Sequence, residues 1–158
     1  MYPLDKIFKP ASIAAIGASD KTGTVGYAIM DNLLTGGYKG KIYPVNPGHR
    51  TIRGRKSFAS VKKITGTVDL AIIAVPAKAV AAVLKDCGEV GIGGAIIITA
   101  GFRESGAEGK RLYDELGQIA RQYNIRIIGP NCLGIIAPAL GLNASFASRM
   151  ALPGKIAF

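Results

Sequence analysis

The chain has 158 residues, a hydrophobic fraction of 49% and a formal net charge of +10, values that fit one folded domain and exclude a disordered chain. No apolar run reaches the roughly 18 residues of a membrane span, and the N-terminal residues MYPLD lack the basic and apolar regions of a signal peptide. Two distant cysteines, Cys87 and Cys132, and one histidine, His49, give no metal-ligand spacing. We therefore expect a cytoplasmic protein with reduced thiols and no bound metal or membrane.

Short apolar strands alternate with helices along the predicted chain. Strands are expected at 12–16, 41–45, 68–75, 95–99 and 125–128, and helices at 24–34, 76–90 and 105–123. Pro76 is tolerated at the start of the second helix, and Ser105 with Glu108 predicts a capping box for the third. Continuous apolar strands alternating with helices are typical of a parallel sheet covered on both faces. The sequence therefore predicts an α/β fold with a doubly wound, mostly parallel, Rossmann-like sheet.

The alternation becomes less regular after Gly134. A further strand is predicted at 144–147, and the segment 153–158, PGKIAF, is typical of a turn that leads into another apolar strand. We therefore expect one domain over residues 1–150, and the start of a following domain at 151–158.

A glycine-rich turn, GASDKTGTVG at 17–26, follows the first predicted strand and precedes the first helix. Unpaired N–H groups and the positive end of the helix dipole favour phosphate at such a place. Gly17 would permit a tight turn, Gly23 would admit a phosphate close to the backbone, and Gly26 would allow close packing of helix on strand. The spacing is longer than the dinucleotide fingerprint G-x-G-x-x-G, but its position favours phosphate binding over a packing role alone.

The end of the second predicted strand decides which phosphate ligand is favoured. An NAD site needs an acidic residue there for the ribose hydroxyl, and residues 44–50, PVNPGHR, contain none. No acidic residue occurs between Asp31 and Asp69, whereas that stretch holds eight lysines and arginines. The basic segment suits a phosphorylated ribose, which both NADP and coenzyme A carry. Aromatic residues are scattered rather than interleaved with the basic ones, which disfavours specific nucleic-acid binding.

Five segments carry a resemblance to a known family. They are IGAS at 16–19, YPVNP at 43–47, AVPA at 74–77, ITAGF at 98–102 and IGPNCLG at 128–134. In this order they resemble the CoA-binding domain of NDP-forming acyl-CoA synthetases, which is related to the α subunit of succinyl-CoA synthetase.

The resemblance implies a CoA site. Phosphates would be held by the residues at 22–25, the adenine or ribose would be flanked by 75–76, and the pantetheine path would be lined by 98–100, with Asn131 near the thiol end. The complete set of expected CoA contacts is Gly17, Ser19, Thr22, Gly23, Thr24, Val25, Asn46, Pro47, His49, Arg50, Val75, Pro76, Ile98, Thr99, Ala100 and Asn131.

The sequence departs from the family at two of these positions. His49 stands where relatives can place a lysine, so Arg50 or Arg53 would supply the charge instead. Ala100 stands where succinyl-CoA synthetases have an acidic residue, which removes a polar contact. Arg53, Arg55 and Lys56 are otherwise expected to be solvated.

The resemblance also implies a reaction in which CoA attacks an acyl phosphate and the phosphate passes through a phosphohistidine to NDP. That histidine belongs to a following domain in the family. Cys87 is expected to pack in the core and Cys132 to be a small buried thiol in a turn, so this chain should bind CoA without catalysing. The expected partners are the remaining synthetase domains or an ATP-grasp β subunit, with a homo-oligomer left open. The alternatives are a stand-alone CoA-binding regulatory protein and an NADP-binding module.

Overall fold

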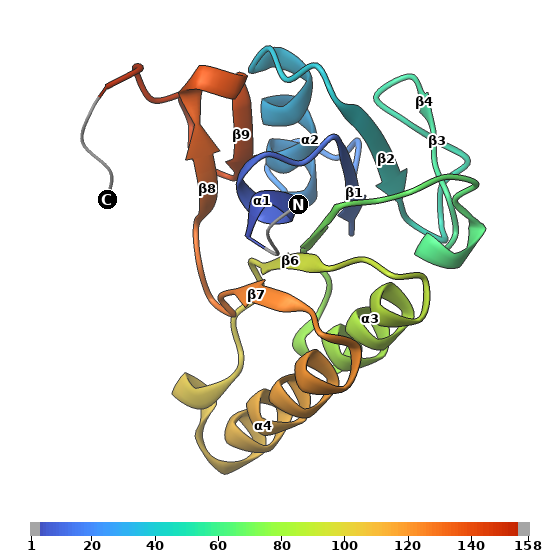
Figure 1. Ribbon diagram of the computed structural model, residues 1–158, viewed down its shortest axis with the longest axis vertical. Coiled ribbons are helices and arrows are strands. Elements are labelled where there is room, and N and C mark those ends of the chain that lie inside the picture. The colour runs from blue at the N-terminus through green and yellow to red at the C-terminus, as the bar shows by residue number, and fades with distance from the viewer. Residues whose placement is uncertain (1–3, 155–158) are drawn as a thin grey trace.

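A five-stranded parallel sheet in the order β2-β1-β5-β6-β7 forms the centre of the computed structural model, which describes residues 4–154 (Figure 1). Its strands are β1 (Ser12–Ile16), β2 (Lys41–Val45), β5 (Leu70–Ile73), β6 (Gly94–Ile97) and β7 (Arg126–Ile128). All five strands were predicted from the apolar runs. The doubly wound, Rossmann-like α/β fold is therefore confirmed.

Helices cover both faces of the sheet. One face carries α3 (Ala77–Glu89) and α4 (Gly106–Tyr123), which lie side by side, and the other carries α2 (Val25–Thr35) with a β-hairpin beside it (Figure 1). Side chains alternate between the two faces along each strand. In β5, Ala71 and Ile73 belong to the core beneath α3 and α4, whereas the alternate residues of the strand belong to the core beneath α2.

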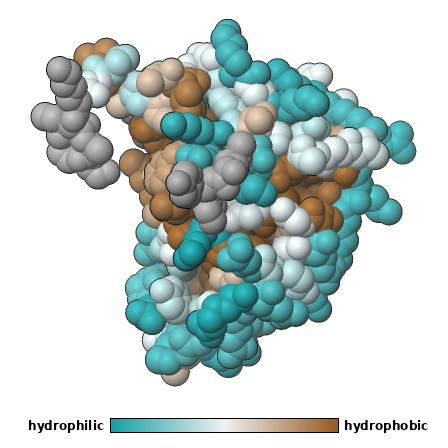
Figure 2. Space-filling model, viewed as in Figure 1, coloured by the Kyte–Doolittle hydropathy of each residue, from teal (hydrophilic) through white to brown (hydrophobic). Residues whose placement is uncertain are grey.

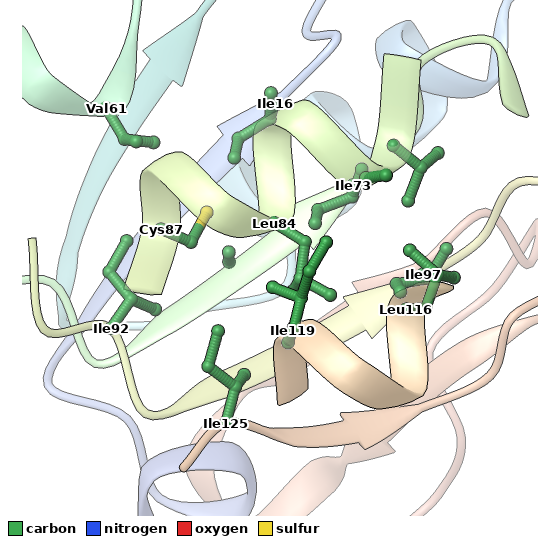
Figure 3. Packing of buried hydrophobic residues seen from close by; sticks show 14 of the residues in the cluster. Ile16, Val61, Ile73, Leu84, Cys87, Ile92, Ile97, Leu116, Ile119 and Ile125 are labelled. Atoms are coloured by element: carbon green, nitrogen blue, oxygen red, sulfur yellow. The ribbon is translucent and has the colours of Figure 1, made fainter. Parts of the chain in front are cut away.

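The core beneath α3 and α4 is built from aliphatic side chains. Figure 3 shows Leu84 and Cys87 of α3 and Leu116 and Ile119 of α4 pointing toward the strands. Leu84 and Cys87 are fully buried at 0% exposure. This packing fixes the helices against the sheet and thereby positions the loops at the ends of the strands.

Two hairpins lie outside the central sheet. The first joins β3 (Thr51–Ile52) to β4 (Arg55–Lys56), and the second joins β8 (Gly134–Ala137) to β9 (Leu142–Ser145). The strand predicted at 144–147 is thus found two residues earlier and is antiparallel. Neither the first hairpin nor β8 was predicted. The second hairpin is fixed to α2 because the Asn32 side-chain amide donates to the carbonyl oxygens of Ser145 at 2.8 Å and of Ala147 at 2.9 Å.

The remaining elements are short. They are α1 (Asp5–Phe8) and the 3-10 turns η1 (Val61–Lys63), η2 (Arg103–Ser105) and η3 (Pro138–Leu140). Most of the strand predicted at 153–158 lies outside the described residues. In the described part of the chain, the helices are too short or too polar to cross a bilayer.

The predicted capping box at the start of α4 is wrong. Ser105 precedes α4, but its side chain makes no capping hydrogen bond. Glu108 instead binds the Arg111 guanidinium, with an Oε1 to Nη2 distance of 2.9 Å. Glu104 accepts the Gly101 backbone N–H at 2.6 Å, and this hydrogen bond lowers the pKa of the Glu104 carboxyl. The loop before α4 is therefore closed by Glu104 and not by Ser105.

Candidate functional site

The topological switch point of the sheet lies between β1 and β5. The chain leaves β1 toward α2 on one face and leaves β5 toward α3 on the other, so the two connections diverge. Ligands of doubly wound sheets bind in the crevice that this divergence opens beyond the carboxyl ends of the strands. The glycine-rich turn at 17–26 starts at this point.

Close backbone contacts shape the glycine-rich turn. Gly17 has a φ of +87°, and a Cβ there would overlap the Ala74 carbonyl oxygen at the end of β5. A Cβ at Gly26 would overlap the Gly17 carbonyl oxygen. The predicted tight turn and the predicted close helix–strand packing are therefore confirmed. Gly23 has a φ of +80°, and a Cβ added there would have no atom within 4 Å, so that position is open.

Hydroxyl groups stabilise the same turn. The Thr24 hydroxyl caps α2, since it accepts the Tyr27 N–H at 3.2 Å and donates to the Lys21 carbonyl oxygen at 2.7 Å. The Ser19 hydroxyl accepts the Lys21 N–H at 3.0 Å. Within residues 4–154, the backbone N–H groups of Thr22 and Gly23 have no acceptor. These exposed donors at the start of a helix suit an anion.

Two clefts open at the carboxyl edge of the sheet. The first cleft, of about 420 Å³, lies between the ends of β1, β2 and β5, α3 and η1. It is lined by Ile16, Gly17, Val45, Asn46, Pro47, Ala59, Ser60, Val61, Ala74, Val75, Pro76, Ala79, Val83 and Asp86. The second cleft has about the same volume and is lined by Val25, Ala74, Val75, Ile98, Thr99, Ala100, Asn131, Cys132, Leu133 and Phe146. Because Ala74 and Val75 line both clefts, the two are neighbours.

The walls of both clefts are apolar and are held in place by polar contacts at their rims. The Asn46 side chain donates to the Ala18 carbonyl oxygen at 2.9 Å and accepts the Gly48 N–H at 2.9 Å. The Thr99 hydroxyl donates to the Val75 carbonyl oxygen at 2.7 Å, and the Asn131 N–H donates to the Thr99 carbonyl oxygen at 2.9 Å. Neighbouring strand ends are thus joined side to side. Figure 2 shows hydrophobic surface beside the end of β2 and along β8, bordered by hydrophilic residues.

The structure brings most of the predicted site residues together. Those that line a cleft are Gly17, Val25, Asn46, Pro47, Val75, Pro76, Ile98, Thr99, Ala100 and Asn131. Ser19, Thr22, Gly23 and Thr24 form the turn between β1 and α2. His49 and Arg50 are exposed and line neither cleft.

Arg53 was predicted to be solvated, but its side chain binds other residues of the protein. Its guanidinium forms an ion pair with Asp31 of α2, donates to the Tyr27 hydroxyl at 3.1 Å and lies 4.9 Å from the centre of the Tyr27 ring. Its backbone N–H donates to Asp20 Oδ1 at 2.8 Å, which joins the β3–β4 hairpin to the glycine-rich turn. The Arg53 guanidinium therefore neutralises Asp31 of the protein, whereas Arg55 and Lys56 are exposed as predicted.

Nine residues of the first cleft were not among the predicted contacts. They are Ile16, Val45, Ala59, Ser60, Val61, Ala74, Ala79, Val83 and Asp86. Ser60 and Val61 come from the connection after the β3–β4 hairpin, and Val83 and Asp86 come from α3. The signal for the helical pair was their spacing from Ala79, which places all three on one face of α3. Leu133 and Phe146 of the second cleft carry no comparable pattern.

The two cysteines differ in their surroundings. Cys87 is fully buried as predicted, and burial raises the pKa of its thiol to about 12. Cys132 is only half-buried and lines the second cleft, with its Sγ 3.4 Å from the Ile97 carbonyl oxygen. Burial also raises the pKa of the Cys132 thiol. No group of three His, Cys, Asp or Glu side chains in the described part of the chain could hold a metal ion.

Comparison with known proteins identifies the family of this fold and site. Residues 11–138 match the family described as CoA binding domain. The chain is 48% identical over 158 residues to the α subunit of the ADP-forming acetate–CoA ligase I of Pyrococcus furiosus, covering 98% of this chain and 34% of that protein. It is 41% identical over 153 residues to the ADP-forming 4-hydroxybutyrate–CoA ligase of Nitrosopumilus maritimus, covering 96% of this chain and 22% of that protein.

The comparison with solved structures points to the same family. The dinucleotide-forming acetyl-coenzyme A synthetase 1 of Ca. Korarchaeum cryptofilum, solved with phosphate and ADP, superposes with a TM-score of 0.91 at 39% identity, covering 96% of this chain and 32% of that one. The chain thus spans about a third or less of the length of these relatives. It belongs to the CoA binding domain family, and coenzyme A is the ligand of that family.

Proposed function

We propose that this chain is the CoA-binding part of an ADP-forming acyl-CoA synthetase. The observation that carries the proposal is the pair of neighbouring clefts at the switch point, which adjoin a glycine-rich turn with free N–H groups. An extended ligand with a nucleotide at one end and an apolar arm at the other fits this arrangement. The relatives named as ADP-forming CoA ligases support the reaction class.

The subsites follow the two clefts. The backbone at 22–25 would hold the phosphates at the N-terminus of α2. The adenosine would occupy the first cleft against Val75 and Pro76, and the pantetheine arm would cross Val75 into the second cleft along 98–100. Asn131 would then lie near the thiol end.

The chemical steps are assigned to other parts of the enzyme. His49 is the only histidine of the chain, and its exposed position outside both clefts does not suit a phosphohistidine that must meet a bound ligand. Residues 1–150 would form the CoA-binding domain, residues 151–158 would be the start of a following domain, and an ATP-grasp domain or β subunit would supply the nucleotide site. We also propose that the complete enzyme is cytoplasmic and that it self-associates.

Isothermal titration calorimetry with CoA, dephospho-CoA and NADP tests the assignment. CoA should bind in the micromolar range, and removal of the 3′-phosphate should weaken binding by about tenfold, since a charge-assisted phosphate contact contributes more than about 1 kcal/mol. NADP should bind far more weakly because it has no pantetheine arm for the second cleft. Tight binding of NADP without binding of CoA would overturn the proposal.

Thiol labelling tests the course of the pantetheine arm. Iodoacetamide should modify Cys132 and leave Cys87 intact, at a rate that rises with pH because both thiols have raised pKa values and only thiolates react. Saturating desulfo-CoA, which keeps the arm but has no thiol to consume the reagent, should slow the modification of Cys132 at least about fivefold by covering the second cleft, whereas 3′,5′-ADP, which lacks the arm, should not. Peptide mass spectrometry reports both sites. Equal protection by the two ligands would contradict the placement of the arm.

A further inference from the structure

The first cleft is apolar except at three side chains, which are Asn46, Ser60 and Asp86. Both ends of the Asn46 amide are used by the protein, as described above. The Asn46 amide is thus held in place by the protein and keeps one N–H, whereas Ser60 and Asp86 offer a hydroxyl group and a carboxylate oxygen. Ser60 is the N-cap residue of η1 and Asp86 lies in α3, and these two elements form one wall of the cleft.

Ser60 and Asp86 each keep one hydrogen-bonding group that no other residue uses within residues 4–154. The Ser60 hydroxyl oxygen accepts the Lys62 N–H at 3.3 Å, and its own O–H has no acceptor within residues 4–154. Asp86 Oδ1 lies 2.6 Å from Lys62 Nζ, while Oδ2 has no partner within the same residues. Ser60 and Asp86 thus offer one free donor and one free acceptor.

Lys62 holds this wall in place. Its ammonium group lies 2.6 Å from Asp86 Oδ1 and 2.6 Å from Glu89 Oε2, so it joins η1 to α3 through two carboxylates. Those two hydrogen bonds raise the pKa of Lys62, which keeps the amine charged. The oxygens of an ionised carboxylate can only accept hydrogen bonds, and Asp86 Oδ2 is the one left without a partner within residues 4–154.

We propose that Asp86 accepts a hydrogen bond from the 6-amino group of the adenine ring of CoA while the Ser60 hydroxyl donates to the neighbouring ring nitrogen. The proposal rests on the proposed function, because it places the base of CoA in the first cleft. Adenine presents an amino donor next to a nitrogen acceptor, whereas a 6-oxo purine presents an oxygen acceptor at the position of the amino group. The 6-oxo group would place two acceptors face to face at Asp86. Ser60 and Asp86 together would therefore select adenine over a 6-oxo purine, with Val61 and Val83 as apolar walls for the flat ring.

Calorimetry with CoA and deamino-CoA, its 6-oxo analogue, tests the selection. The natural chain should prefer CoA by about tenfold or more, because the base would cover the carboxylate of Asp86, which is 36% exposed in the free chain, and a 6-oxo purine would leave that acceptor without a donor. Asp86→Asn should reduce this preference to about twofold or reverse it, since a carboxamide can turn its NH₂ group toward the 6-oxo oxygen. The ratio of the two dissociation constants is the readout, and a purely structural defect would weaken both ligands alike.

Glu89→Gln is the matched control. It makes the same carboxylate-to-amide change on the same helix and removes an ion pair with the same lysine, but Glu89 does not line the cleft. Its preference for CoA should equal that of the natural chain. Equal preference in Asp86→Asn and Glu89→Gln would overturn the proposal, as would equal binding of CoA and deamino-CoA by the natural chain. Failure of the natural chain to bind CoA would instead overturn the proposed function.

Discussion

Gly26→Ala is expected to abolish measurable CoA binding at concentrations that saturate the natural chain. The added Cβ would overlap the Gly17 carbonyl oxygen and lie 3.3 Å from the Ser19 backbone nitrogen. Both are backbone atoms of the glycine-rich turn, so the clash cannot be relieved by turning a side chain. Either α2 or the turn must move, and overpacking of this kind costs about 1–3 kcal/mol. The same movement displaces the N–H groups of Thr22 and Gly23, which are assigned to the phosphates.

Calorimetry with CoA and thermal unfolding are the measurements for this variant. Gly117→Ala is the control, because it makes the same change inside a helix, where the nearest atom to the new Cβ is Arg121 Nη1 at 3.6 Å. That control should bind CoA normally and be as stable as the natural chain or up to about 1 kcal/mol more stable, since alanine has the higher helix propensity. Binding of CoA by Gly26→Ala within about twofold of the natural affinity would contradict the role given to the turn.

The centre of the sheet was predictable because β1, β5 and β6 are buried on both faces and therefore form continuous apolar runs. β1 and β2 match the predicted 12–16 and 41–45 to the residue. The predicted strand at 68–75 was too long, because the chain leaves the sheet at Ala74 and places Val75 between the clefts. The last residues of an apolar run can belong either to the strand or to the wall of a cleft, and the sequence alone does not show which.

The β3–β4 hairpin could not be predicted from local pattern. Each of its strands has only two residues, which is too short for an alternation of side chains. Its turn at Arg53 and Gly54 has positive φ angles of 51° and 70°, and an arginine is not a residue that favours this region. The contacts of Arg53 with Asp20 and Asp31 hold it there, and both partners are distant in sequence.

The residues of the candidate site were also predictable only in part. The glycine-rich turn and the strand ends were found because topology alone brings the carboxyl ends of parallel strands to one edge. Ser60 and Asp86 were not found, because they face this edge from a 3-10 turn and from one side of α3. The predicted capping box failed since Glu108 has Arg111 as a nearer partner. The spacing of Ser105 and Glu108 allows a capping box, but it does not show that the Glu108 carboxylate binds Arg111 in its place.

Phe102→Ala is expected to destabilise the fold by about 3–5 kcal/mol, the usual cost of emptying a core phenylalanine position. Phe102 is 1% exposed and belongs to the core beneath α3 and α4. A domain of this size has a free energy of unfolding of about 5–15 kcal/mol, so the loss is a large part of the total. The midpoint of urea unfolding should fall accordingly. Phe102→Leu keeps most of the apolar volume and should cost less than about 1.5 kcal/mol.

The position of Phe102 adds a prediction about the ligand. It follows the cleft-lining segment 98–100, and α4 packs so closely on it that a Cβ at Gly109 would overlap the Phe102 carbonyl oxygen. Loss of the ring should therefore loosen the second cleft while leaving the first intact. CoA affinity should fall about tenfold in the folded variant, whereas affinity for 3′,5′-ADP, which does not reach the second cleft, should stay within about twofold. An equal loss of affinity for CoA and 3′,5′-ADP would show that the substitution disturbs both clefts. A loss of less than about 1 kcal/mol in the free energy of unfolding would show that the Phe102 ring does not stabilise the core.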